Sequence, residues 1–593
     1  MNRHVLKWTT ALGLILGAVM VPLLARSAIA PARAAVARPA QGTVEGTVMQ
    51  QGGGPVAGAV VRLPTTTNMT ISGADGSFTL GGLQDGVQVT LTAWQAGYIV
   101  GSARVTPPQN GAIISMRLHY TEDNPDYQWF SSNDPGHSMS CMHCMVAYPQ
   151  WQPNAHANSA TSPRFFSVYN GTDLTGMADV APGYKDDFPG TAGNCAACHS
   201  PAAVIPGIAT PITGTTTITG SISADMNAVS GVEAEGSFCE FCHKIGEVYL
   251  DPATGLPYDD KPGVLSTRMY RSPPGHVLWF GPFDDVARRV TYLELEKKSQ
   301  FCAPCHQFSF GGTPIYESFR EWLESPYPAL GIECQTCHMK PTGVDYFVFP
   351  EKGGFTRDPS LIASHLQPGA SDVELLQNTV NMAVSAEQTD GSLQVTVVVT
   401  NTDAGHHVPT DHPGRHMILL VSATDAQGQA IPQQGGPTVP DWGGDRADLS
   451  GKAFAKVLQD DASGESPVVG YWKPVTIISD NRIAAMESDT SVYTFTAPPE
   501  GGRVTVDVKL IFRRLYQDLM DAKDWDTPDI VMEEVQVELV TTPATATPTP
   551  TSAPTSTPTP TSTPAPTSTP TPTATPVRLY LPLTVNVGAS GKG

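Results

Sequence analysis

Charged residues are scarce in this chain, and positive charge is scarcer than negative charge. Of 593 residues only 15% are charged, with 35 Lys and Arg against 56 Asp and Glu, which gives a formal net charge of -21. A protein this acidic repels nucleic acid, so we expect no nucleic-acid partner. Low charge together with 55 glycines and 53 prolines excludes a helical bundle and indicates a loop-rich, β-rich protein.

Long apolar runs are also missing, except near the N-terminus. There Arg3 and Lys7 precede an apolar stretch over 11–25, and small residues follow up to Ala35. This order predicts a signal peptide over 1–35, and hence export to the periplasm or the extracellular cell surface. A retained membrane anchor is the alternative, because the run is near the lower length limit for a spanning helix. We expect no transmembrane span in the mature chain.

The rest of the chain divides by its pattern of apolar residues. Short alternating runs broken by glycine, such as VQVTLTAW and AIISMRL, predict a small antiparallel β-sandwich over 42–118. Alternation is absent over 119–371, where only short helical pieces such as Ile315 to Glu324 are predicted. It returns in LQVTVVVTN and HMILLVSATD, which predict a larger β-sandwich over 372–540. We therefore expect a multidomain, mainly β fold in which two sandwiches flank a loop-rich, short-helix segment.

Residues after 540 also lack the alternation of apolar and polar residues that predicts strands. Residues 541–576 are almost wholly Thr, Pro, Ser and Ala, a composition typical of an extended polyproline II stalk. The apolar tail over 577–593 could serve as a strand, a partner tag or an envelope-attachment signal.

No cysteine stands alone, because all ten cysteines fall into five Cys-x-x-Cys pairs, four of which are followed at once by histidine. These four motifs consist of Cys195, Cys198 and His199; Cys239, Cys242 and His243; Cys302, Cys305 and His306; and Cys334, Cys337 and His338. Two thiols at this spacing can add to the two vinyl groups of one haem while the adjacent imidazole binds the iron. Structural zinc or disulfides, the alternatives, give no reason for a histidine after each pair. We expect four haem c groups, whose porphyrins supply the apolar core that 119–371 otherwise lacks.

The fifth pair, Cys141 and Cys144, is followed by Met145 instead of histidine. Three interpretations stay open: a fifth haem whose iron is bound by Met145 or a distant histidine, a disulfide, or a lapsed haem motif. A methionine ligand would raise the potential of that haem, whereas an unligated iron would leave room for a substrate.

Each six-coordinate haem needs a second axial ligand, and the chain has more histidines than the motifs use. Six histidines lie in loop-like sequence and are candidate iron ligands: His137, His156, His276, His365, His406 and His407. The string AGHHVPTDHPGRH, over 404–416, places four histidines in one predicted loop between two strands. A zinc site is one interpretation, but we prefer iron binding by His406 or His407, which would make the second sandwich a lid over the haem segment. His412 and His416 are predicted to be surface or packing residues.

The middle segment resembles a family of multihaem c-type cytochromes related to the hydroxylamine-oxidoreductase-linked tetrahaem cytochrome c. The matching pieces include EFCHKIGE, HVLWFGPFDD, FCAPCH with EWLES, and GIECQTCHM, and they cover about 120–370. The resemblance implies bis-histidine haems stacked closely enough to pass electrons, with His156, His276 and His365 as second ligands. The sequence departs from the family pattern at Met145, where a histidine would be expected.

Residues 42–118 resemble the carboxypeptidase regulatory-like domain, which is related to carbohydrate-binding folds. The resemblance rests on the turn at Asp75 and Gly76, the Phe strand that follows, and the terminal Gly97 and Tyr98. It implies a structural spacer, with glycan or cell-wall contact as the alternative.

These observations favour an exported multihaem cytochrome that relays electrons between envelope donors and an extracellular acceptor or redox protein partner. Two alternatives are a multihaem oxidoreductase that acts on a small nitrogen or sulfur compound at an open haem, and a glycan-binding or scaffold surface protein. No carboxylate pair, nucleophile triad or phosphate loop points to another chemistry. No catalytic residue is therefore predicted, and an electron carrier is favoured over an enzyme.

Overall fold

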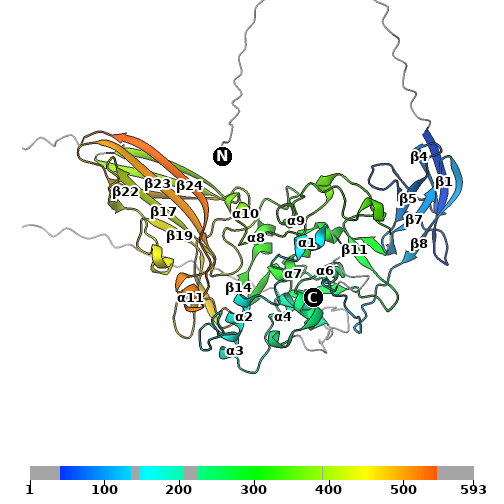
Figure 1. Cartoon of the computed structure of the whole chain (residues 1–593), viewed down its shortest axis with the longest axis horizontal. Helices are drawn as coiled ribbons and strands as arrows, with labels where there is room; N and C mark the ends of the chain where they lie inside the picture. Colours follow the sequence, from blue (N-terminus) through cyan, green and yellow to red (C-terminus); the bar gives the residue numbers. More distant parts are fainter. Residues whose placement is uncertain are drawn as a thin grey trace, which may run out of the picture. The chain divides into compact units, whose positions relative to one another are not determined.

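The computed structural model describes residues 41–134, 144, 146–205, 223–287, 289–389 and 391–543, and Figure 1 labels their main elements. All of these residues lie in one compact unit, Met1–Pro543. The predicted signal peptide and tail, the predicted stalk from residue 544 on, and His137, Cys141 and Met145 lie outside the described residues, while Thr541, predicted as the first residue of the stalk, is the last residue of a strand. Within the described ranges, no helix has both the length and the apolar character that crossing a membrane requires.

The first strands form two four-stranded sheets that share one apolar core. In β1 (Gln41–Gln50), Val44 and Val48 are fully buried while Glu45 between them is exposed, as alternation predicts. The sheet orders are β4-β1-β8-β6 and β3-β2-β5-β7. The other strands are β2 (Val60–Arg62), β3 (Met69–Ile71), β4 (Ser77–Gln84), β5 (Val89–Trp94), β6 (Tyr98–Ile99), β7 (Gly101–Val105) and β8 (Gln109–Leu118).

This first sandwich is not wholly antiparallel, which corrects the prediction for 42–118. β1 pairs with β8 in parallel, with Val48 beside Ile114, while its other edge pairs with β4 in antiparallel fashion. Apolar residues alternate in the same way in both kinds of pair, so the pattern does not specify strand direction. The chain passes through six other strands between β1 and β8, and this long connection lets β8 return in the direction of β1.

The middle of the described chain holds short helices joined by loops. Its longest helix, α2 (Pro163–Asn170), begins after a Ser162 cap and ends at Gly171, whose φ of 67° suits glycine. The other α-helices are α1 (Ala147–Trp151), α3 (Tyr184–Asp187), α4 (Ala196–His199), α5 (Pro201–Val204), α6 (Cys239–Cys242), α7 (Ala303–His306), α8 (Ser318–Glu324), α9 (Cys334–His338) and α10 (Val373–Gln377). Short 3-10 helices are η3 (Met226–Ala228), η4 (Gly231–Glu235), η5 (Gly263–Ser266), η6 (Glu294–Lys297), η7 (Ser299–Phe301), η8 (Pro350–Lys352) and η9 (Pro359–Leu361).

Three two-stranded sheets also lie in this segment. They pair β9 (Ile245–Val248) with β10 (Thr267–Met269), β11 (Trp279–Gly281) with β12 (Val290–Tyr292), and β13 (Phe308–Phe310) with β14 (Thr313–Tyr316). The helix predicted over Ile315 to Glu324 is therefore shorter than expected, because Ile315 belongs to β14 and α8 begins at Ser318. Ile315 is fully buried, and its branched side chain favours the extended backbone.

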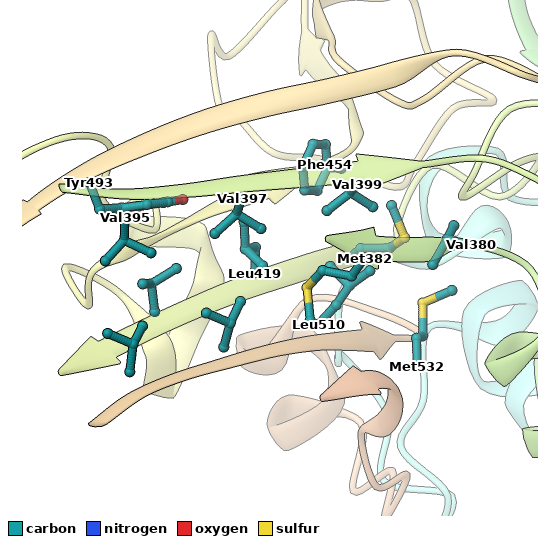
Figure 2. Packing of buried hydrophobic residues seen from close by; sticks show 14 of the residues in the cluster. Val380, Met382, Val395, Val397, Val399, Leu419, Phe454, Tyr493, Leu510 and Met532 are labelled. Atoms are coloured by element: carbon teal, nitrogen blue, oxygen red, sulfur yellow. The ribbon is translucent and has the colours of Figure 1, made fainter. Parts of the chain in front are cut away.

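The last part of the described chain forms a second, larger pair of sheets, with orders β15-β16-β22-β18 and β19-β17-β23-β24. Figure 2 shows Val397 of one sheet packed with Leu419 and Leu510 of the other. The elements are β15 (Asn381–Thr389), β16 (Ser392–Thr400), β17 (His416–Asp425), β18 (Gln433–Gly435), η10 (Asp441–Arg446), β19 (Gly451–Phe454), β20 (Lys456–Asp460), β21 (Val475–Asp480), β22 (Ser488–Thr496), β23 (Gly502–Arg513), α11 (Gln517–Ala522) and β24 (Ile530–Thr541). The predicted mainly β fold class is confirmed.

The loop between β16 and β17 carries the AGHHVPTDHPGRH string and is held by its own polar contacts. The Asn401 side chain donates to the backbone carbonyls of His406, at 2.8 Å, and Ile483, at 3.1 Å. Val408 and Ile483 form a backbone bridge. Asp411 has a φ of 61°, in the left-handed region that Asp tolerates better than most residues. These contacts hold the loop in one conformation and so fix the positions of its polar side chains.

Candidate functional site

Each Cys-x-x-Cys-His motif folds into a single helical turn. In three motifs the backbone N–H of the histidine donates to the carbonyl of the first cysteine, at 2.9 Å for His199, 3.1 Å for His243 and 3.2 Å for His306. The fourth motif is helix α9, whose start is closed by reciprocal hydrogen bonds between Glu333 and Thr336. Residues three and four apart lie on one helix face, so each turn presents its two thiols and its imidazole together.

Thiols of different motifs meet in the middle segment. Cys198 and Cys305 lie close enough for each to shift the pKa of the other, and so do Cys302 and Cys334. Cys242 lies close enough to Cys302 and Cys305 to interact electrostatically with both. No disulfide joins any of the nine described cysteines. The pair formed by Cys302 and Cys305 is therefore the neighbour of all three other motifs.

Two of the thiols lie in surroundings that disfavour charge, whereas the pKa of Cys334 is lowered to about 7, mainly by its interaction with Cys302. Burial raises the pKa of Cys195 to about 11 and that of Cys242 to about 12. Each described cysteine nevertheless keeps part of its surface exposed. A thiolate is disfavoured at these two positions, whereas an uncharged thioether suits them.

A hydrogen bond at Nδ1 orients every motif histidine. The acceptors are the carbonyl oxygens of Ser159 for His199 (3.0 Å), Phe280 for His243 (2.9 Å) and Pro368 for His338 (2.8 Å), and the Oδ2 of Asp411 for His306 (3.3 Å). These oxygens only accept, so Nδ1 carries a proton, and in the neutral ring Nε2 then keeps its lone pair. That tautomer leaves Nε2 available to a metal ion.

Three motif histidines lie close to a second histidine from a distant part of the chain. The ring centres are 6.2 Å apart for His306 and His156, 6.3 Å for His338 and His406, and 6.4 Å for His243 and His365. All three second histidines were predicted as iron ligands from the sequence, but the pairing was not.

This separation fits an iron ion held between two imidazoles. A metal–imidazole bond is about 2.0–2.1 Å long and the ring centre lies about 1.1 Å behind the bonding nitrogen, so two ligands on opposite sides place their centres about 6.2–6.4 Å apart. Burial lowers the pKa of both His156 and His365 to about 4, which keeps these rings neutral near pH 7. The residues present therefore fit a haem with two histidine ligands.

The remaining predicted ligands contact other groups. His276 Nε2 lies 3.3 Å from the hydroxyl of Tyr120, and His407 Nδ1 lies 3.7 Å from Oε1 of Glu321. The Sγ of Cys144 lies 3.9 Å from the carbonyl oxygen of Phe347. Neither His276 nor His407 faces a motif histidine in the part of the chain that the structure describes.

His199 and the last two histidines of the loop have aromatic neighbours. His199 stacks on Phe165 with 4.3 Å between ring centres, and within the described ranges no histidine faces it. His416 is fully buried and stacks on Tyr516 at 5.2 Å, while His412 lies 5.8 Å from Tyr471. No group of three or more His, Cys, Asp or Glu side chains among the described residues could hold a metal ion.

The buried ion pairs around the loop between β16 and β17 were not predicted from the sequence. Glu321 of α8 accepts a hydrogen bond from the backbone N–H of His407 at 3.2 Å and pairs with Arg482 at 2.6 Å. Lys456 pairs with Glu317, and all four of these charged side chains are at most 3% exposed. The pairs join α8 and the residue before it to β20 and to the segment after β21, and these two strands form a sheet of their own. The charged residues are visible in the sequence. Each of them pairs with a residue far away in the chain, so the pairs could not be predicted.

Asp411 was also missed, because an acidic residue in a loop is ordinarily a surface residue. It is only 8% exposed. Burial favours a higher pKa for Asp411, yet the hydrogen bond from His306 holds that pKa well below its ordinary value. Burial likewise favours a lower pKa for His306, yet Asp411 raises it to about 9. The two side chains therefore interact strongly.

No protein-family model matches the sequence, and no curated protein matches it. Among solved structures, the chain is similar to a penta-heme cytochrome c552 from Thermochromatium tepidum, with 19% identity and a TM-score of 0.49, over 67% of this chain and 97% of that chain. It is also similar to a DUF4426 family protein from Pseudomonas aeruginosa, with 10% identity and a TM-score of 0.12, over 28% of this chain and 93% of that chain. Because both TM-scores lie below 0.5, these likenesses establish neither the fold nor the function of this chain.

Proposed function

We propose that this chain is an exported multihaem c-type cytochrome that relays electrons outside the cytoplasmic membrane. The observation that carries the proposal is the placement of three motif histidines opposite second histidines, at separations of 6.2–6.4 Å that suit an iron ion between them. The Nδ1 hydrogen bonds support it, because they leave the metal-binding nitrogen of each motif histidine free.

Each motif would hold one haem c through two thioethers and one imidazole. The second ligands would be His365 opposite His243, His156 opposite His306, and His406 opposite His338. When bound, haem c supplies an iron that takes up and releases one electron at a time. The chain's own part is to fix the ligands, to exclude water with buried apolar residues such as Trp151 and Phe241, and to set the potentials.

The contacts among the thiols support a particular order of sites. Cys305 lies near Cys198 and Cys302 lies near Cys334, while Cys242 lies near both members of the same pair. The site at Cys302 and Cys305 would therefore be the common neighbour of the other three. A relay built in this way branches at one central site.

Export rests on the signal peptide predicted over 1–35, and surface placement rests on the stalk predicted over 541–576. The partners would be an envelope electron donor and an extracellular acceptor or redox protein. The formal net charge of -21 favours a partner with a basic surface, because opposite charges speed encounter.

Visible spectroscopy of the full chain, exported from a host that matures c-type cytochromes, tests this proposal. We expect a low-spin haem c spectrum that reduction and reoxidation interconvert reversibly. Replacing both Cys239 and Cys242 by Ser should remove one haem's share of the absorbance. The matched replacement of Cys141 and Cys144 by Ser shows whether that pair holds a fifth haem. A colourless protein, or unchanged absorbance in the first variant, contradicts the proposal.

A further inference from the structure

The carboxylate of Asp411 is fixed against a motif histidine through both of its oxygens. Its Oδ2 accepts the hydrogen bond from Nδ1 of His306 at 3.3 Å, and its Oδ1 accepts one from the backbone N–H of Ser318 at 3.2 Å. Asp411 belongs to the loop between β16 and β17, whereas His306 belongs to α7. The loop of the second sandwich thus places a charge directly behind an expected iron ligand.

The other three motif histidines are held differently. His199 and His338 donate to the backbone carbonyls of Ser159 and Pro368, which carry no net charge. His243 lies 3.2 Å from a carboxylate oxygen of Glu296, but the carbonyl of Phe280 is closer to its Nδ1, at 2.9 Å. Because Nδ1 carries a single proton, the carbonyl takes the larger share of that bond. Among the described contacts, only His306 has a carboxylate as its sole Nδ1 acceptor.

A carboxylate acceptor changes the chemistry of the opposite nitrogen. A charge-assisted hydrogen bond is stronger than one to a carbonyl, and it makes the imidazole a more basic metal ligand. Reduction adds one electron to ferric iron and lowers its charge by one. A more basic ligand and a nearby fixed negative charge both stabilise the ferric form, so they lower the reduction potential.

Resting on the proposed function, we propose that Asp411 makes the haem at Cys302, Cys305 and His306 the most reducing member of the relay. That haem would also be the common neighbour of the other three, so electrons moving between them would meet an energetic step at the centre. The second sandwich then sets the potential of a haem that it does not itself attach. Arg415, a cation near Asp411, donates to the carbonyl of Thr410 at 3.2 Å and tempers the negative charge.

Potentiometric titration of the exported full chain tests this inference through the variant Asp411→Asn. Asparagine keeps the size of the side chain and one acceptor oxygen and tolerates the left-handed backbone, so the variant removes the charge together with one of the two hydrogen bonds that Asp411 accepts. We expect the lowest haem midpoint potential to rise by at least about 59 mV, which corresponds to a tenfold change in the equilibrium constant of a one-electron reduction. The matched control is Glu296→Gln, for which we expect a smaller rise, because Phe280 still holds His243.

A second variant keeps the inference testable if Asp411→Asn loses a haem. His156→Met replaces the imidazole opposite His306 by a thioether, which raises the potential of that haem. The midpoint that moves should be the lowest one of the unaltered protein. The inference is overturned if His156→Met changes a different midpoint potential, or if every midpoint potential stays the same in a folded Asp411→Asn protein. A protein without covalent haem would instead refute the proposed function.

Discussion

Each motif histidine has two ring nitrogens with separate tasks. Nδ1 donates to a fixed oxygen, which sets the orientation of the ring, and Nε2 is left with a lone pair. The second histidines differ from one another in the hydrogen-bond partners of their rings. His406 has its own Nδ1 contact to the carbonyl of His407 at 2.8 Å, whereas His156 interacts with the side chain of Gln367. Differences of this kind give otherwise similar sites different potentials.

Two adjacent histidines offer a sharp test of the ligand assignment. The sequence left His406 and His407 as alternatives, but only His406 faces a motif histidine, His338, at 6.3 Å. We therefore expect His406→Ala to convert one haem from low-spin to high-spin while the number of haems stays the same. His407→Ala should leave every haem low-spin. Electron paramagnetic resonance of the oxidised proteins measures both outcomes.

Free imidazole provides the control for this pair of variants. Added to the His406→Ala protein, it should restore the low-spin signal, because a vacated ligand position accepts a small imidazole. Unchanged spin states in His406→Ala, or a high-spin signal that appears only in His407→Ala, would exclude the pairing of His406 with His338.

The motif residues were predictable from sequence because their spacing is local. Cys195, Cys198 and His199 lie within one helical turn, so five consecutive residues are enough to recognise a haem motif. The partners of the motif histidines were not predictable as pairs, because tertiary structure brings them together. His156 and His306, for example, come from opposite ends of the middle segment.

At the scale of elements, helix α8 is the connection between the expected haem sites and the second sandwich. Its Glu321 contacts the histidine loop at His407 and binds Arg482, which follows β21. Glu317, just before α8, binds Lys456 of β20. Charged groups this deeply buried are stable only in pairs, so the helix and the strands hold each other in place.

Removing one member of this network should destabilise the fold strongly. Arg482 is 3% exposed and pairs with both Glu321, at 2.6 Å, and Asp480, at 2.8 Å. We expect Arg482→Met to lower the free energy of unfolding by about 3–5 kcal/mol, because it leaves the buried carboxylate of Glu321 without its cationic partner. Urea denaturation measures the change.

The matched control is an exposed arginine of the same sandwich. Arg503 is 64% exposed and pairs with Glu538 at 3.6 Å, so Arg503→Met should cost less than about 1 kcal/mol. Equal losses in the two variants would show that the buried network contributes no more than a surface ion pair.

Strands were predictable where one face of a sheet is buried. The run LQVTVVVTN became β16, whose Val395, Val397 and Val399 are buried in the core. Strand direction was not predictable, as the parallel pairing of β1 with β8 shows. Strand ends were uncertain too, because Ile315 has the same apolar character in a strand as in a helix.

At the scale of the whole molecule, the β-rich and loop-rich parts of the chain have different roles. The two sandwiches and the middle segment each have an apolar core, and the middle segment also holds all eight cysteines of the four motifs. Trp151, Phe238 and Phe241 are buried together there, which corrects the expectation that the segment lacks an apolar core without porphyrins. The second sandwich also reaches into the middle segment through His406 and Asp411.

The central claim is that thioether-linked haems occupy the Cys-x-x-Cys-His motifs. Intact mass spectrometry of the mature exported protein, after denaturation and extraction of free haem, tests it most directly. We predict the mass of the polypeptide plus four or five covalent haem groups, because the thioether bonds survive unfolding. A mass equal to that of the bare polypeptide, after expression with an active haem-attachment system, would contradict the claim.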